Sequence, residues 1–167
     1  MLALLGEQPA HGFALARAMA PDGEVGRVWG LRRPLVYRAL DTLNRVGFVR
    51  PVGTLPSSSG PQRTILEITQ AGASALAEWL SEPVPRVRDA RSLLMLKLLF
   101  LIRSEADLEP LLVAQREEFA LRVRSLSAAA EQAEGFDRAL LVWRLQSTDA
   151  AIRFTDTMLA ERPRSGG

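Results

Sequence analysis

Apolar residues recur at helical spacing along most of the chain, and the clearest stripe lies between residues 34 and 47. It comprises positions at i, i+4, i+7 and i+10: Val36, Leu40, Leu43, and Val46 or Gly47. This spacing predicts one face of an amphipathic helix. Pro34 suits the first turn of that helix, because the N–H that proline lacks would have no partner there. Gly47 is placed to end the helix, since glycine readily adopts the left-handed conformation that often follows a last turn.

Two shorter helices are predicted ahead of this one, over residues 1–9 and 10–23. Glycine and proline residues end both of them. The second has a looser apolar face, for which the candidates are Phe13, Leu15 or Ala16, and Met19 or Ala20. Residues 24–31 are ambiguous and fit a turn with one short extended piece.

Two strands are predicted after the amphipathic helix, over residues 48–54 and 63–69. The Pro/Ser/Gly-rich stretch 55–62 between them cannot hold regular structure, so the pair forms a hairpin with a long tip. Thr69 is placed to cap a following helix over residues 70–80. The apolar face of that helix consists of Ala73, Leu76, Ala77 and Leu80. Three helices, a two-stranded wing and a helix, in this order, are typical of a winged helix-turn-helix.

The rest of the chain is predicted to be almost entirely helical. Residues 88–103 are apolar on most sides, which indicates a helix buried from more than one direction. Ser104 and Asp107 resemble a capping box at the start of a long helix that ends at Gly135. The apolar face of that helix consists of Leu108, Leu111, Leu112, Phe119, Val123 and Leu126. A last helix has a stripe of Phe136, Leu140, Trp143, Ala150, Phe154 and Met158.

The two long helices need partners for their apolar faces. They are expected to fold on each other, to cross to a second subunit, or both. The predicted fold is therefore mainly α with a small two-stranded β-wing. A winged helix-turn-helix domain occupies residues 1–83, a helical dimerisation region residues 84–162, and a disordered tail residues 163–167.

Composition argues against most enzyme classes. The chain has 167 residues, no cysteine and a single histidine, His11, so it lacks material for disulfides, for thiolate or histidine zinc sites and for a catalytic triad. It shows no phosphate-binding loop and no nucleophile paired with a base. A non-enzymatic protein without a cofactor or metal is expected. Residues 93–102 are intensely apolar but too short to span a membrane, and no export signal is seen. A cytoplasmic location, associated with the nucleoid and not with a membrane, is predicted.

Positive charge is concentrated in one part of the chain. The formal net charge is only +2, and an arginine-rich composition by itself is also what a G+C-rich genome produces. Between residues 27 and 50, however, six arginines face a single acidic residue, Asp41. This asymmetry indicates a polyanionic partner.

Four stretches resemble the PadR family of transcriptional regulators. They are LLGEQPAHGFALARAM (residues 4–19), LVYRALDTLNRVGFV (35–49), QRTILEITQAGASALAEWL (62–80) and RDARSLLMLKLLFL (88–101). The chain departs from the family pattern at Phe13, where a tyrosine is frequent, at Asn44, where a glutamate is frequent, and at Ile65 or Leu66, where an aromatic residue is frequent. The resemblance implies a homodimeric winged-helix repressor.

The candidate DNA contacts lie on the amphipathic helix and the wing. Arg32, Arg33 and Arg38 are the leading candidates, because a guanidinium can bind guanine O6 and N7 together in the major groove. Pro34 belongs to the same first turn. Tyr37 and Arg50 are expected to contact phosphates, and the wing tip, residues 57–62, with Arg63 to contact a phosphate or the minor groove. The opposing interpretations are a solvated helix face, a tyrosine packed under the wing and a loop without a role.

Two further residues are candidates of a different kind. His11 is interpreted as structural, or as lying near a phosphate, and not as a metal ligand. Trp143 is a candidate contact for a small aromatic or drug-like effector, since aromatic rings stack on planar molecules, and relatives bind such molecules near this region. Core and interface packing is the alternative for all three tryptophans.

The predicted function is thus a PadR-like repressor that binds a pseudo-palindromic duplex operator as a homodimer and is released by a small-molecule effector. One alternative is a winged-helix protein–protein interaction module without DNA binding. Another is a MarR-like regulator, although that type has a dimerising helix before the winged helix, and here the winged helix begins at residue 1.

Overall fold

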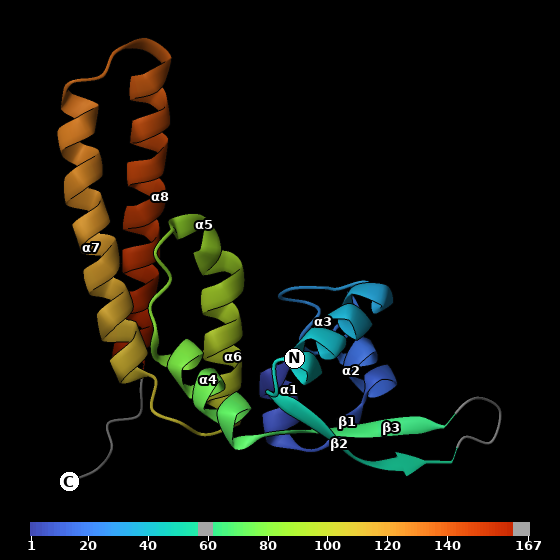
Figure 1. Ribbon diagram of the computed structural model, residues 1–167. Coiled ribbons are helices and arrows are strands. Elements are labelled where there is room, and N and C mark those ends of the chain that lie inside the picture. Colours follow the sequence, from blue (N-terminus) through green and yellow to red (C-terminus); the bar gives the residue numbers. More distant parts are fainter. Residues whose placement is uncertain (57–61, 162–167) are drawn as a thin grey trace, which may run out of the picture. The chain divides into compact units, whose positions relative to one another are not determined.

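The computed structural model describes residues 1–56 and 62–161, and the chain divides into two compact units, residues 1–80 and 81–167 (Figure 1). Residues 57–61 of the predicted wing tip (57–62) and the predicted tail (163–167) lie outside the described residues. The first unit contains α1 (Leu2–Glu7), β1 (Ala10–His11), α2 (Gly12–Ala18), α3 (Arg33–Arg45), β2 (Val49–Leu55), β3 (Arg63–Ile68) and α4 (Gln70–Ser81). The fold is mainly helical with a small antiparallel wing, as the sequence predicts.

Helix α3 forms where its apolar stripe predicts it. Pro34 lies in its first turn, and Val36 and Leu40 are buried in the core of the first unit. The predicted last member of the stripe is wrong, because the side chain of Val46 is 54% exposed. The helix ends at Arg45, and Gly47, with φ +77°, turns the chain away from the helix, as the sequence predicts. Val46 therefore never continues the face that packs on the core.

The sheet has three strands in the order β1-β3-β2, all antiparallel. Residues 49–55 pair with residues 63–68 as a hairpin, and the register shifts between Pro51 and Gly53. The third strand, β1, was not predicted. It is only two residues long and pairs through Ala10↔Leu66 and His11↔Ile65, which is too short to leave a periodic pattern.

Helix α4 is fixed by its cap. Thr69 Oγ1 accepts a hydrogen bond from the N–H of Gly72 (3.1 Å) and donates one to the carbonyl of Gly47 (2.7 Å). The predicted N-cap is thus confirmed, and it ties the start of α4 to the end of α3. Of the predicted apolar face of α4, Ala77 is exposed, and the remaining members, Ala73, Leu76 and Leu80, are half-buried.

Gly72 lies so close to the Phe48 carbonyl that a side chain has no room. A Cβ built at Gly72 would lie 2.1 Å from that oxygen. We expect Gly72→Ala to lower the free energy of unfolding by more than about 2 kcal/mol, because a backbone atom cannot move aside as a flexible side chain can. Gly53→Ala is the matched control, since its Cβ would meet nothing within 4 Å, and its effect should stay within about 0.5 kcal/mol. Denaturant unfolding of both variants checks this, and equal stabilities would contradict the packing seen at Gly72.

The second unit contains α5 (Val87–Asp89), a π-helical turn η1 (Ala90–Leu94), α6 (Met95–Arg103), α7 (Glu109–Glu131) and α8 (Gly135–Ala160). Its core combines residues from all the longer helices: Val84, Leu94, Leu98, Leu111, Leu112 and Phe119 are buried, and Ile152 and Leu159 pack against them. Lys97 is buried, and burial lowers the pKa of its ammonium group while Glu82 opposes that change.

Helices α7 and α8 lie side by side as a hairpin (Figure 1). Gln115 ties the chain before α5 to α7. Its Oε1 accepts from the Val84 N–H (2.7 Å), and its Nε2 donates to the Val84 carbonyl (2.9 Å). Because α7 and α8 pack on each other, the hairpin predicted within one chain is present. Its turn lies at Gly135, where φ is +55°.

The predicted capping box before α7 is wrong. Ser104 Oγ donates to the Leu101 carbonyl, and Asp107 Oδ1 accepts from the Glu109 N–H. Helix α7 begins at Glu109 with Pro110 in its first turn. Proline has a preset φ and no N–H to satisfy, so it fixes the start of the helix later than the Ser–Asp spacing indicated.

The predicted apolar stripe of α8 exists, and its last member, Met158, packs against the core, but its aromatic members do not. Phe136 is 79% exposed and Trp143 69%, and Phe154 is also exposed. The face that packs inward has two threonines instead, Thr148 and Thr155. Their hydroxyls donate to the Arg144 and Ala151 carbonyls at 2.7 Å. Because each hydroxyl is satisfied within its own helix, threonine can be buried at little cost.

Among the residues that the structure describes, no helix is both long and apolar enough to cross a membrane.

Candidate nucleic-acid interface

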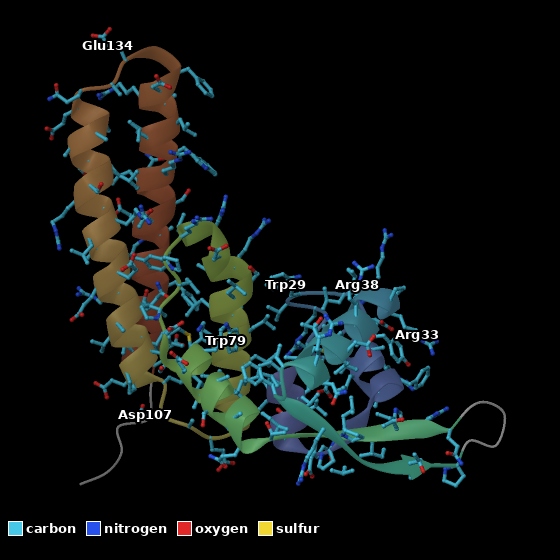
Figure 2. The ribbon with its side chains drawn as sticks, in the orientation of Figure 1. Trp29, Arg33, Arg38, Trp79, Asp107 and Glu134 are labelled. Atoms are coloured by element: carbon cyan, nitrogen blue, oxygen red, sulfur yellow. The ribbon has the colours of Figure 1, made fainter. Side chains whose placement is uncertain are left out.

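The first turns of α3 present exposed basic side chains. Arg32 is the N-cap residue, with extended backbone (φ −69°, ψ 141°), and Arg33 and Pro34 follow it into the helix. Arg32, Arg33 and Arg38 are all exposed (Figure 2 labels Arg33 and Arg38). Within residues 1–56 and 62–161, none of the three forms an ion pair. These charges are therefore available to a partner from outside the chain.

Arg33 is held by two aromatic rings. Its guanidinium carbon lies 5.3 Å from the centroid of the Phe13 ring and 5.6 Å from that of Tyr37. Arg63, at the start of β3, lies 5.1 Å from the same Phe13 ring. Exposed cation–π contacts of this kind contribute about 0.5–1 kcal/mol each. Two candidates that are far apart in sequence, one on the helix and one on the wing, are thus brought together.

Phe13 is another residue whose burial the sequence predicts wrongly. The helical spacing predicted it in the core, but its side chain is 41% exposed. The core positions of α2 are taken by Leu15 and Ala16, and Met19 follows the helix into the core. The departure of position 13 from the family pattern was the one signal in the sequence that drew attention to it.

The start of α2 is fixed by His11. Its Nδ1 accepts a hydrogen bond from the Ala14 N–H at 3.0 Å, so the side chain caps the helix. Gly12 then passes close to α3, since a Cβ there would lie 2.8 Å from Tyr37 Cε1. Tyr37 packs against this turn with its ring partly exposed.

A cavity of about 570 Å³ opens between α3, the start of α2 and the wing. Arg33, Tyr37 and Asn44 line it from α3, Phe13 from α2, and Arg63 and Thr64 from β3. One carboxylate, Asp41, also lines it. The wall thus combines two guanidinium groups with aromatic surface.

Arg50 differs from the other candidates because it already has a partner. Its Nε donates to Glu67 Oε1 at 2.8 Å, and its Nη2 contacts the same oxygen. The pair forms because Arg50 and Glu67 face each other across β2 and β3. A role for Arg50 at a phosphate stays a prediction, and a phosphate would have to compete with this carboxylate.

Trp143 lies in the second unit, in a cavity of about 610 Å³ between α5, α7 and α8. Four arginines line this cavity: Arg86, Arg88, Arg122 and Arg144. Arg122 donates to the Pro85 carbonyl (2.9 Å), and Arg88 Nε lies 3.9 Å from Asp89 Oδ1.

No group of three or more His, Cys, Asp or Glu residues that could hold a metal ion occurs in the part of the chain that the structure describes.

Comparison with known proteins relates the first unit to a family of regulators. Residues 1–78 match the model of the transcriptional regulator PadR-like family. This region therefore resembles the PadR-like family. It is also 30% identical, over 91 residues, to the probable transcriptional regulator Rv1176c of Mycobacterium tuberculosis. That match covers 54% of this chain and 47% of the relative, so this chain spans about half the length of the protein it matches.

Solved structures also resemble the chain at low sequence identity. Bacillus subtilis PadR, in complex with operator DNA, is 19% identical with a TM-score of 0.46, covering 95% of this chain and 96% of that one. The smu.1604c protein from Streptococcus mutans UA159 is 15% identical with a TM-score of 0.44, covering 96% of each chain.

Proposed function

We propose that this PadR-like chain is a transcriptional repressor that binds a pseudo-palindromic duplex DNA operator as a homodimer. The observation that supports DNA binding best is the set of exposed arginines on the first turns of α3, which have no carboxylate partner in the described part of the chain. The match of residues 1–78 to the family model supports the regulatory role. Such a regulator would act at the nucleoid, in the cytoplasm.

In this proposal α3 is the recognition helix. The first half of such a helix comes closest to the base edges of the major groove, and an arginine fork there can bind guanine O6 and N7. Arg32, Arg33 and Arg38, beside Pro34, would occupy that groove. Tyr37, Arg63 and Arg50 would contact the backbone and fix the orientation of the domain.

Binding should depend steeply on salt, because each neutralised phosphate releases a counterion. The logarithm of the affinity is expected to fall with the logarithm of the salt concentration by about 0.9 for each contacted phosphate. Selection of bound fragments from genomic DNA, repeated across salt concentrations, tests this and yields the operator. Absent or salt-insensitive binding would overturn the proposal.

The homodimer is supported by the exposed stripe on α8. Phe136, Trp143 and Phe154 recur along one side of a helix whose neighbouring side, which contains Thr148 and Thr155, packs in the core of the second unit. Exposed aromatic surface of this extent on a regular element marks an interaction site. A two-fold symmetric pairing of such faces would place two α3 helices on two half-sites of one operator.

A small aromatic effector would bind in the cavity beside Trp143. The indole can stack on a planar ring, and the four arginines of the wall favour an effector that also has an anionic group. A planar aromatic acid that releases the wild-type protein from DNA, but not a Trp143→Leu variant that still dimerises and binds DNA, would support this assignment. Release of both proteins alike would contradict it.

A further inference from the structure

Two arginines from different elements share one aromatic ring. Phe13 contacts Arg33, from the first turn of α3, and Arg63, from the first residue of β3, with both guanidinium carbons within 5.3 Å of its centroid. These two residues are thirty positions apart and belong to the helix and to the wing. The exposed ring of Phe13 is the surface that brings them together.

This arrangement places two like charges at most about 10 Å apart, since each guanidinium carbon lies within 5.3 Å of one ring centroid, and both side chains line the same cavity. Neither Arg33 nor Arg63 has an ion pair within the residues that the structure describes. The negative faces of the rings of Phe13 and Tyr37 offset part of their mutual repulsion, and the carboxylate of Asp41 lines the same cavity. Two exposed cations on the wall of one cavity favour the binding of a single anion between them. A phosphate can accept hydrogen bonds from two guanidinium forks at once.

The position of the Phe13 ring is restricted by the two residues that precede it. His11 caps α2 through its bond to Ala14, and Gly12 lies tightly against Tyr37. The backbone that carries the Phe13 side chain therefore has little conformational freedom. Side chains that are ordered before binding lose less entropy when the partner arrives.

We propose that Phe13 is a positioning residue that places Arg33 and Arg63 on the same backbone phosphate of bound DNA. The proposal rests on the DNA-binding function proposed above. It assigns Arg33 to the backbone and leaves Arg32 and Arg38 as the arginines that read bases. The helix and the wing are then joined at one phosphate, which sets how deeply α3 enters the groove.

The test compares Phe13→Leu with Phe13→Tyr in the full chain. Leucine keeps an apolar side chain but removes the aromatic face, whereas tyrosine keeps the ring. Affinities are measured for the selected operator fragment and for an unrelated duplex, each across a salt series, and thermal unfolding is recorded for both variants.

We expect Phe13→Leu to weaken binding to both duplexes about three- to tenfold and to lower the salt slope by about 0.9, the value for one lost phosphate. Equal losses on the two duplexes are expected because a phosphate contact is not sequence-specific. Phe13→Tyr should retain the affinity and the slope of the wild type. In an Arg63→Ala background Phe13→Leu should add little further loss, since the two changes remove the same contact.

Several outcomes would overturn the proposal. An unchanged salt slope in Phe13→Leu, or a Phe13→Tyr variant as weak as Phe13→Leu, would mean that Phe13 only fills space. A loss confined to the operator would place Arg33 at a base. If the wild-type protein binds no duplex, the proposed function fails together with this inference, whereas wild-type binding with an unaffected Phe13→Leu variant overturns the inference alone.

Discussion

Reversing the charges of Arg33 and Arg38 together is expected to abolish binding to duplex DNA. Both side chains are exposed on α3, and neither has an ion pair in the described part of the chain, so their replacement by glutamate leaves no buried group unpaired. The fold should therefore persist. Two favourable phosphate or base contacts become repulsive, and we expect an affinity loss of at least about a hundredfold at moderate salt. Fluorescence anisotropy with a labelled operator fragment measures it.

A double reversal elsewhere in the chain provides the control. Arg91→Glu with Arg124→Glu changes the formal net charge by the same amount, from +2 to −2, at exposed positions of the second unit. If the loss arises from local contacts, this variant should bind DNA almost as tightly as the wild type. Equal losses in the two variants would show that only net charge matters and would remove the reason to place α3 in the groove.

The variant with Arg33 and Arg38 reversed also distinguishes a DNA-binding repressor from a winged helix that binds a protein. A repressor should lose its operator when Arg33 and Arg38 are reversed. A module that serves protein assembly should show no duplex affinity in the wild type and should keep its protein partner after the reversal. Co-purification and anisotropy on one preparation distinguish the two.

The elements of the first unit could be predicted because their ends are encoded locally. Pro34 and Thr69 define where α3 and α4 begin, and Gly47, with its positive φ, defines where α3 ends. Each of these residues acts through its own backbone or through a partner within a few positions. Local signals of this kind can be seen in one sequence.

Contacts between distant positions could not be predicted in the same way. The pair of Arg50 and Glu67 depends on the register of β2 and β3, which includes an irregularity between Pro51 and Gly53. The contact of Arg63 with Phe13 requires α2 and the wing to meet, and nothing near either residue encodes it. The candidate site was therefore found residue by residue on α3, whereas its link to the wing was missed.

The stripe on α8 shows a different limit. The helix has two faces that can be buried, one rich in aromatic residues and one that contains Thr148 and Thr155. Hydrophobicity alone favours the aromatic face as the one that packs in the core. The structure uses the other, because the threonine hydroxyls bond to their own helix and their small side chains allow close packing. A periodic pattern identifies faces but not which neighbour each face meets.

That exposed aromatic face leads to the last prediction. Replacing Phe136 and Phe154 together by aspartate should convert a dimer into a monomer of 18.3 kDa. Neither side chain contributes to the buried core of the second unit, so the hairpin of α7 and α8 should remain folded. Burying two carboxylates in an apolar interface would cost several kcal/mol for each. We expect this cost to exceed the favourable free energy of dimerisation. Sedimentation velocity measures the mass, and circular dichroism verifies the helical content.

Leu121→Asp is the matched control, because Leu121 is exposed on α7 and two positions, about 200° around the helix, from the buried Phe119. It introduces one carboxylate, half the charge of the double variant, on a face turned away from the buried Phe119 and should leave the dimer intact. The monomeric variant keeps one intact α3, so it should still bind a single half-site, but its affinity for the full operator should fall by about a hundredfold or more as the second contact ceases to be intramolecular. Full operator affinity in a proven monomer would show that each domain binds independently. A wild-type protein that sediments as a monomer would exclude the symmetric repressor altogether, since two recognition helices would then have no common axis to set their spacing.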